Sequence, residues 1–98
     1  MDIKKRTEDG ALTIALKGKL DTTTAPALEK ELEEDLPGVK ELVFDFEELE
    51  YISSAGLRVL MKTQKRLGAG GSMVVRHVQD LVMEVFEVTG FTDILTIE

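Results

Sequence analysis

Two adjacent serines, Ser53 and Ser54, are the residues of this chain whose type and position could support chemistry. They lie in the segment 51–58, YISSAGLR, directly before an apolar pattern with helical spacing. On spacing alone the favoured interpretation is an N-cap, in which a serine oxygen accepts hydrogen bonds from free backbone N–H groups. The alternative is phosphorylation, because the N–H groups and the dipole of a helix start favour anions. A phosphate would add about −1.5 to −2 charge and would regulate partner binding rather than folding.

A second polar cluster, Asp21 to Thr24, precedes another predicted helix. Strand 12–18 leads into this cluster, and strand 42–46 leads towards the two serines. If these strands are parallel, both helix starts lie at the edge where open α/β sheets bind their ligands. Asp21 and the serine pair are therefore candidates for one shared site, in which Asp21 either caps its helix or contacts a partner.

The elements that must position these residues follow from changes in hydrophobic period along the chain. Asp9-Gly10 predicts a hairpin turn between a weak strand at 2–7 and an alternating strand at 12–18. A leucine at every fourth position predicts a helix that starts near 21–24 and ends at Pro37-Gly38. The remaining predicted elements are a buried strand at 42–46, a loop at 47–53, a helix at 54–67, a strand at 73–75, a helix around 81–86 that ends at Gly90, and a last short strand or extended tail at 94–97.

This order, a β-hairpin followed by α-β-α-β-α-β, predicts an α/β fold over residues 1–98 as one domain. Strands joined through a helix are normally parallel, so the sheet is expected to be mixed and mostly parallel, with helices packed on it.

Composition excludes several classes of function. The net charge of −7 argues against general nucleic-acid binding. The chain has no cysteine and a single histidine, His77, which excludes disulfides, thiol catalysis and thiolate or multi-histidine metal sites. No apolar stretch approaches the roughly 20 residues of a membrane span. The charged N-terminus lacks the apolar region of a signal peptide, so a cytoplasmic location is expected.

The other polar groups favour structural interpretations. A Ser-His-Asp triad would need Ser54, His77 and an aspartate to converge, and there is no Gly-x-Ser-x-Gly motif. No Walker-type or Gly-x-Gly-x-x-Gly loop is present to hold a nucleotide. A solvated surface is the preferred interpretation of two charged sets, an acidic one (Glu47, Glu48, Glu50) and a basic one on the serine helix (Arg58, Lys62, Lys65, Arg66), although the basic face could also dock an acidic partner.

Residues 49–60, LEYISSAGLRVL, resemble the signature of the STAS family of anti-sigma factor antagonists. Residues 18–26, GKLDTTTAP, and 85–91, VFEVTGF, are similar to two less specific motifs of the same family. The resemblance spans nearly the whole chain and implies a STAS domain over 1–98 with no catalytic activity, no cofactor and no metal.

The resemblance also implies a mechanism. In this family the unphosphorylated antagonist binds an anti-sigma factor that is also a serine kinase, and so frees a sigma factor. The kinase phosphorylates a serine at the start of the second helix, and a serine phosphatase removes the phosphate. Aligned on Gly56-Leu57, that serine is Ser54, with Ser53 as runner-up; Ser53 stands where the family often has aspartate.

The partner-binding residues that the resemblance implies are Asp21, Thr22, Thr23, Ser53, Ser54, Gly56 and Arg58. Neither direct nucleic-acid binding nor membrane insertion is expected. Some STAS-only proteins instead act as accessory subunits of membrane transport ATPases without phosphorylation, and this alternative stays open. An enzyme that uses His77 ranks last.

Overall fold

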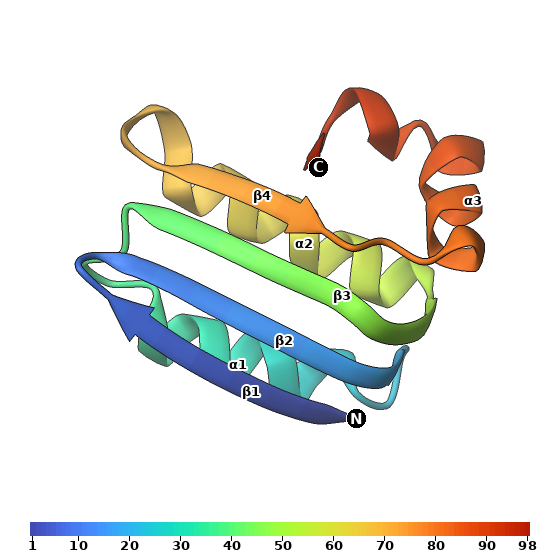
Figure 1. The fold of residues 1–98 in the computed structure, drawn as a ribbon, viewed down its shortest axis with the longest axis horizontal. Coiled ribbons are helices and arrows are strands. Elements are labelled where there is room, and N and C mark those ends of the chain that lie inside the picture. Colours follow the sequence, from blue (N-terminus) through green and yellow to red (C-terminus); the bar gives the residue numbers. More distant parts are fainter.

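The computed structural model describes all residues, 1–98, and arranges five strands and three α-helices around one sheet (Figure 1). The elements in chain order are β1 (Asp2–Glu8), β2 (Ala11–Leu20), α1 (Ala25–Asp35), β3 (Glu41–Ile52), α2 (Ser54–Leu67), a short 3-10 turn (Gly68–Gly70), β4 (Ser72–Arg76), α3 (Asp80–Thr89), a second 3-10 turn (Phe91–Asp93) and β5 (Thr96–Ile97). The strand order is β1-β2-β3-β4-β5, with β1 antiparallel to β2 and the other neighbours parallel. The predicted mixed, mostly parallel sheet is therefore confirmed.

The first turn forms as its sequence predicts. Asp9 and Gly10 have φ angles of 48° and 81°. Two consecutive positive φ angles are what a tight two-residue hairpin turn requires, and Asp-Gly tolerates them well. Glu8 and Ala11 consequently pair with each other directly beside the turn, at the end of the β1–β2 ladder.

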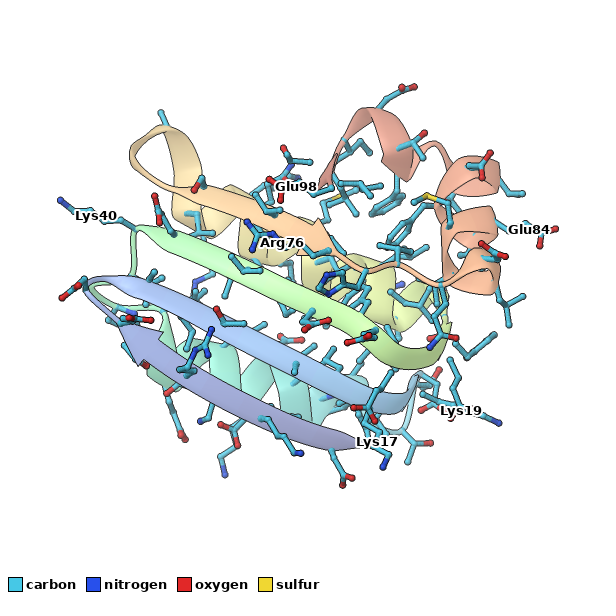
Figure 2. The ribbon with its side chains drawn as sticks, viewed as in Figure 1. Lys17, Lys19, Lys40, Arg76, Glu84 and Glu98 are labelled. Atoms are coloured by element: carbon cyan, nitrogen blue, oxygen red, sulfur yellow. The ribbon has the colours of Figure 1, made fainter.

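The two faces of the sheet differ. The helices α1 and α2 lie behind it in the view of Figure 1, and α3 lies beyond the carboxyl ends of β3 and β4. Alternate strand residues face α1 and α2 and are buried, with Ile14, Phe44 and Val75 completely inaccessible. The residues between them point to the other face, which no helix covers. This open face carries half-buried apolar side chains and many charged ones (Figure 2).

Strand β3 is longer than predicted, and the predicted loop at 47–53 is wrong. The strand continues to Ile52 because β2 also continues to Leu20 and keeps pairing with it. Two register shifts, between Ala15 and Lys17 and between Gly18 and Lys19, each place one extra residue on β3. The buried positions of β3 are therefore no longer two residues apart beyond Phe46, which hides the strand from a period-two pattern.

Helix α1 begins at Ala25 with Thr24 as its N-cap residue and Pro26 in its first turn, as the sequence predicts, and the residues before Thr24 form a turn. The predicted short strand or tail at 94–97 contains the two-residue strand β5. None of the helices combines the length and the apolar character needed to span a bilayer.

Candidate functional site

The two predicted polar clusters meet at one edge of the sheet. The backbone N–H of Ser53 donates to the carbonyl oxygen of Leu20 at 2.9 Å, which joins the carboxyl end of β3 to that of β2. Directly after these residues, the chain turns into the starts of α2 and α1. The parallel strands thus place Asp21 and the serine pair side by side, as the strand order predicts.

The turn ahead of α1, residues 21–24, is closed by its own side chains. Oδ1 of Asp21 accepts hydrogen bonds from the backbone N–H groups of Thr23 at 2.9 Å and Thr24 at 3.1 Å. The hydroxyl of Thr24 accepts from the N–H of Asp21 at 2.9 Å and donates to the carbonyl of Lys19 at 2.8 Å. The hydrogen bond from the N–H of Thr24 lowers the pKa of Asp21, and the bond from Thr23 adds to this effect. Partial desolvation acts in the opposite direction, but the pKa stays below its usual value. Asp21 thus closes the turn ahead of α1 and does not cap the helix itself, whose N-cap residue Thr24 makes no side-chain capping hydrogen bond. Oδ2 of Asp21 makes no hydrogen bond.

The start of α2 is open. Ser53 occupies the N-cap position with extended backbone, φ −101° and ψ 177°, but its side chain makes no capping hydrogen bond. Its Oγ is buried and has no partner. Ser54 follows as the first helical residue, is exposed, and makes no side-chain hydrogen bond. The capping bond predicted for the serines is therefore absent, and the first N–H groups of α2 have no side-chain acceptor.

Gly56 lets the first turn of α2 approach the strand ends closely. A Cβ atom at this position would lie 2.8 Å from Cγ1 of Ile52 and 2.8 Å from Cγ of Leu20. Such separations are shorter than carbon–carbon van der Waals contact, so only glycine fits here without a shift of the helix. Gly56 is itself buried. It positions Ser54, and its predicted place among the partner contacts stays a prediction.

The exposed rim of the site consists of hydroxyl and basic side chains. Thr22, Thr23 and Arg58 are exposed around the two helix starts. Further along α2, Lys62 pairs with Glu29 of α1 at 3.2 Å, while Arg58 makes no ion pair. The site has no histidine or carboxylate bonded to a serine hydroxyl, so neither serine is activated as a nucleophile. Chemically the site offers an exposed hydroxyl that an external enzyme could modify.

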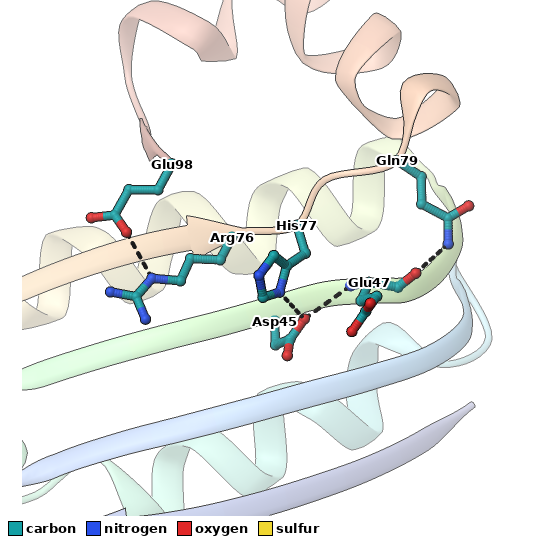
Figure 3. A network of polar contacts seen from close by, with 6 residues as sticks. All are labelled: Asp45, Glu47, Arg76, His77, Gln79 and Glu98. Atoms are coloured by element: carbon teal, nitrogen blue, oxygen red, sulfur yellow. Dashed lines mark hydrogen bonds and ion pairs between the residues drawn. The ribbon is translucent and has the colours of Figure 1, made fainter.

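His77 lies elsewhere, on the open face of the sheet (Figure 3). Its Nδ1 is 3.0 Å from Oδ1 of Asp45, and no hydrogen bond connects it to Ser54. The triad that the sequence analysis ranks last does not form. Asp45 was missed as a site residue. Aligning the apolar runs 42–44 and 73–75, which pair residue by residue in the sheet, would have placed Arg76 opposite Asp45 and His77 next to it.

Comparison with known sequences gives a consistent set of relatives. The family described as "Mlab, STAS domain" matches residues 3–96. The "Putative anti-sigma factor antagonist BtrV" of Bordetella bronchiseptica is 38% identical over 91 residues, which cover 91% of this chain and 78% of that protein. The anti-sigma-B factor antagonist of Staphylococcus aureus (strain NCTC 8325 / PS 47) is 28% identical over 99 residues, which cover 97% of this chain and 90% of that protein.

Solved structures share the fold. An anti-sigma factor antagonist from Mycobacterium paratuberculosis superposes with a TM-score of 0.89 at 25% identity, covering 98% of this chain and 83% of that chain. The Bacillus cell fate determinant SpoIIAA in its phosphorylated form superposes with a TM-score of 0.77 over 99% of this chain and 91% of its own. At 17% identity the second match shows likeness of fold alone.

Proposed function

The chain belongs to the STAS domain family, and from that premise we propose that it acts as an anti-sigma factor antagonist switched off by phosphorylation of Ser54. The named relatives from Bordetella and Staphylococcus support the antagonist role. The observation that carries the residue assignment is the open start of α2, where Ser54 is exposed and the helix lacks a side-chain cap. The proposal assigns no catalysis to this chain.

Phosphorylation at Ser54 suits the local physics. A kinase partner would transfer the γ-phosphoryl group of ATP to Oγ of Ser54; the new O–P bond forms as the bond to ADP breaks, and the hydroxyl proton is released. The phosphate would lie at a helix start whose N–H groups and dipole favour an anion. The fold therefore tolerates the modification, and its charge acts on whatever protein docks there. A serine phosphatase would restore the binding form.

The docking face would comprise the exposed residues around Ser54. Thr22, Thr23 and Arg58 form its rim, and Ser53 lies at its base. Oδ1 of Asp21 makes all the hydrogen bonds of that carboxylate, so Oδ2 is free to accept from a partner. A phosphate on Ser54 would add negative charge near the ionised Asp21 and repel a partner surface that fits the unmodified site.

The direct test is binding to the anti-sigma factor kinase of the source organism. Ser54→Ala should bind in the presence of ATP without being switched off, whereas Ser54→Asp should bind about 10-fold or more weakly. Ser72→Asp is the matched control, because Ser72 is also exposed but lies at the start of β4. The phosphate of native protein should map to Ser54 by mass spectrometry. Undiminished binding by Ser54→Asp would refute the switch, and a phosphate on Ser53 would reassign it.

The second candidate is an accessory subunit of a membrane transport ATPase. Helix α3 favours it, because Leu81 and Val88 are 53% and 83% exposed and would be covered in a permanent complex. The native protein would then co-purify with an ATPase from the membrane fraction. Its Ser54 would carry no phosphate under any growth condition, which distinguishes this role from the antagonist.

A further inference from the structure

Three side chains of metal-ligating type meet on the open face of the sheet, away from the serines (Figure 3). Asp45 and Glu47 lie two residues apart on β3, and His77 directly follows β4. Asp45 pairs in register with Arg76, the residue before His77. One donor atom from each of the three side chains lies within 4.8 Å of the other two. The cluster joins β3 to the segment after β4, so inspection of either segment alone does not reveal it.

The separations suit a shared cation. Oδ1 of Asp45 and Nδ1 of His77 are 3.0 Å apart. Two ligands bound to one tetrahedral zinc ion at about 2.0–2.2 Å are about 3.3–3.6 Å apart, so these two atoms need to separate by only about 0.3–0.6 Å. The same pair of atoms that now shares a proton could therefore share a metal. The carboxylate of Glu47 is exposed and makes no hydrogen bond or ion pair, so its side chain is free to turn towards the other two.

The local charges favour a cation. Arg76 is near Asp45, but its Nε is bound to Glu98 at 2.7 Å (Figure 3). Lys17, which lines the same hollow as Asp45 and Glu47, lies 3.7 Å from Glu48. Lys4 also lines this hollow but makes no ion pair with either carboxylate. Apart from the imidazole, Asp45 and Glu47 are thus left without an ion-pair partner, and with a neutral imidazole the three donors carry two negative charges.

Asp45 is already held in a fixed orientation. Its Oδ1 accepts a hydrogen bond from the backbone N–H of Glu47 at 3.0 Å and lies 3.0 Å from Nδ1 of His77. The amide of Gln79 donates to the carbonyl of Glu47 and fixes the backbone between the two strands. Contacts of this kind orient ligands before a metal arrives and raise its affinity.

We propose that Asp45, Glu47 and His77 form a binding site for a first-row divalent cation such as Zn²⁺. Two carboxylate oxygens and one imidazole nitrogen suit Zn²⁺, Mn²⁺, Co²⁺ or Ni²⁺, with water at the remaining positions. The bound ion clamps the middle of β3 to the connection between β4 and α3. This inference stands apart from the proposed function, since it uses neither the serines nor a protein partner.

The test is a titration of the untagged full chain with ZnCl₂, followed by calorimetry and by NMR of the imidazole nitrogens. His77 is the sole histidine, so its ring signals are unambiguous. We expect one Zn²⁺ per chain and a shift of the His77 ring nitrogens that excess EDTA reverses. His77→Asn should weaken binding by about 10-fold or more. Asparagine is chosen because residue 77 has a φ of 57°, which asparagine tolerates well.

Two further variants keep the result interpretable. Glu47→Gln removes one exposed carboxylate charge and should also weaken binding by about 10-fold or more, without a change in fold. Glu84→Gln removes an exposed carboxylate on α3 and should leave the affinity unchanged. The proposal is overturned if the wild type shows no saturable binding, or if His77→Asn and Glu47→Gln bind Zn²⁺ as Glu84→Gln does. In either case the cluster is a hydrogen-bonded ion pair only.

Discussion

The starts of α1 and α2 lie against the same sheet edge, yet their polar groups are used in opposite ways. At α1 the carboxylate of Asp21 and the hydroxyl of Thr24 each bond to backbone groups of the turn. At α2 the hydroxyl of Ser53 has no partner, and that of Ser54 faces solvent. The turn ahead of α1 uses its side chains to stabilise the fold. The start of α2 is stabilised by backbone and packing, which leaves the exposed hydroxyl of Ser54 available.

The difference shows how a modification site can avoid disturbing its own fold. If Ser54 or Ser53 made the cap, a phosphate would break a stabilising bond as it formed. Here the position of α2 is fixed by the close contact at Gly56 and by the bond from Ser53 N–H to Leu20. Four variants, given from the largest expected effect to the smallest, test this contrast.

Gly56→Ala should break the packing that holds α2. The added methyl would lie 2.8 Å from buried atoms of Ile52 and Leu20, so the helix must shift. We expect the free energy of unfolding to fall by about 1–3 kcal/mol, even though alanine favours helix by up to about 1 kcal/mol over glycine. Urea denaturation measures this. The matched control is Gly70→Ala, where an added Cβ meets nothing within 4 Å. Equal stability of the two variants would contradict the packing role.

Thr24→Ala should loosen the turn ahead of α1. The variant loses the bonds of the Thr24 hydroxyl to the N–H of Asp21 and the carbonyl of Lys19. The expected loss of stability is about 1 kcal/mol, the usual net contribution of a hydrogen bond. Thr22→Ala is the control, because Thr22 is exposed and makes no side-chain hydrogen bond, and it should change stability little. A larger loss of stability in Thr22→Ala than in Thr24→Ala would contradict the role given to the Thr24 hydroxyl.

Asp21, in the turn ahead of α1, should also make the free energy of unfolding depend on pH in the acid range. The pKa of Asp21 is lowered from the ordinary 3.8, so its ionised form stabilises the fold above that pH and ceases to do so as pH falls through the lower value. Asp21→Asn should therefore flatten the decline of unfolding free energy below about pH 4. Asp93→Asn, which removes an exposed carboxylate without a hydrogen bond, should keep the wild-type slope. If the free energy of unfolding of Asp21→Asn declined with pH as that of the wild type does, Asp21 would not be the group that stabilises this turn.

Ser53→Ala should have the smallest effect. The Oγ of Ser53 is buried without a partner, so its removal breaks no hydrogen bond. We expect stability to change by less than about 0.5 kcal/mol, measured in the same urea series as Thr24→Ala. A loss as large as that of Thr24→Ala would show that the side chains before both helices stabilise the fold equally, and the contrast between them would disappear.

Local signals in the sequence were sufficient for most of the fold. Asp9-Gly10 marked the hairpin, the spacing of Leu28 and Leu32 marked α1, and the apolar run from Leu42 to Phe46 marked the first part of β3. The later part of β3 was missed because its bulges break the alternation on which strand prediction depends. The position of a bulge depends on the pairing with the neighbouring strand, and a short stretch of sequence contains no information on that pairing.

The site was predictable to the extent that topology decides it. Parallel strands had to bring Asp21 and the serines to one edge, and they do. The orientation of a hydroxyl was not predictable, because Ser53 could cap α2 from the same backbone position that it now occupies without doing so. The pair of Asp45 and His77 depends on the register of β3 against β4, which is set by packing over many residues.

The order of the strands in the sheet repeats their order in the chain. As the polypeptide leaves the ribosome, each new strand therefore meets a neighbour that has already been synthesised, and no gap waits for a later segment to fill it. A nascent chain that has emerged as far as Ile52 already contains the hairpin, α1 and the complete central strand. The most local contacts can form first, and the two-residue β5 joins the edge of the sheet last.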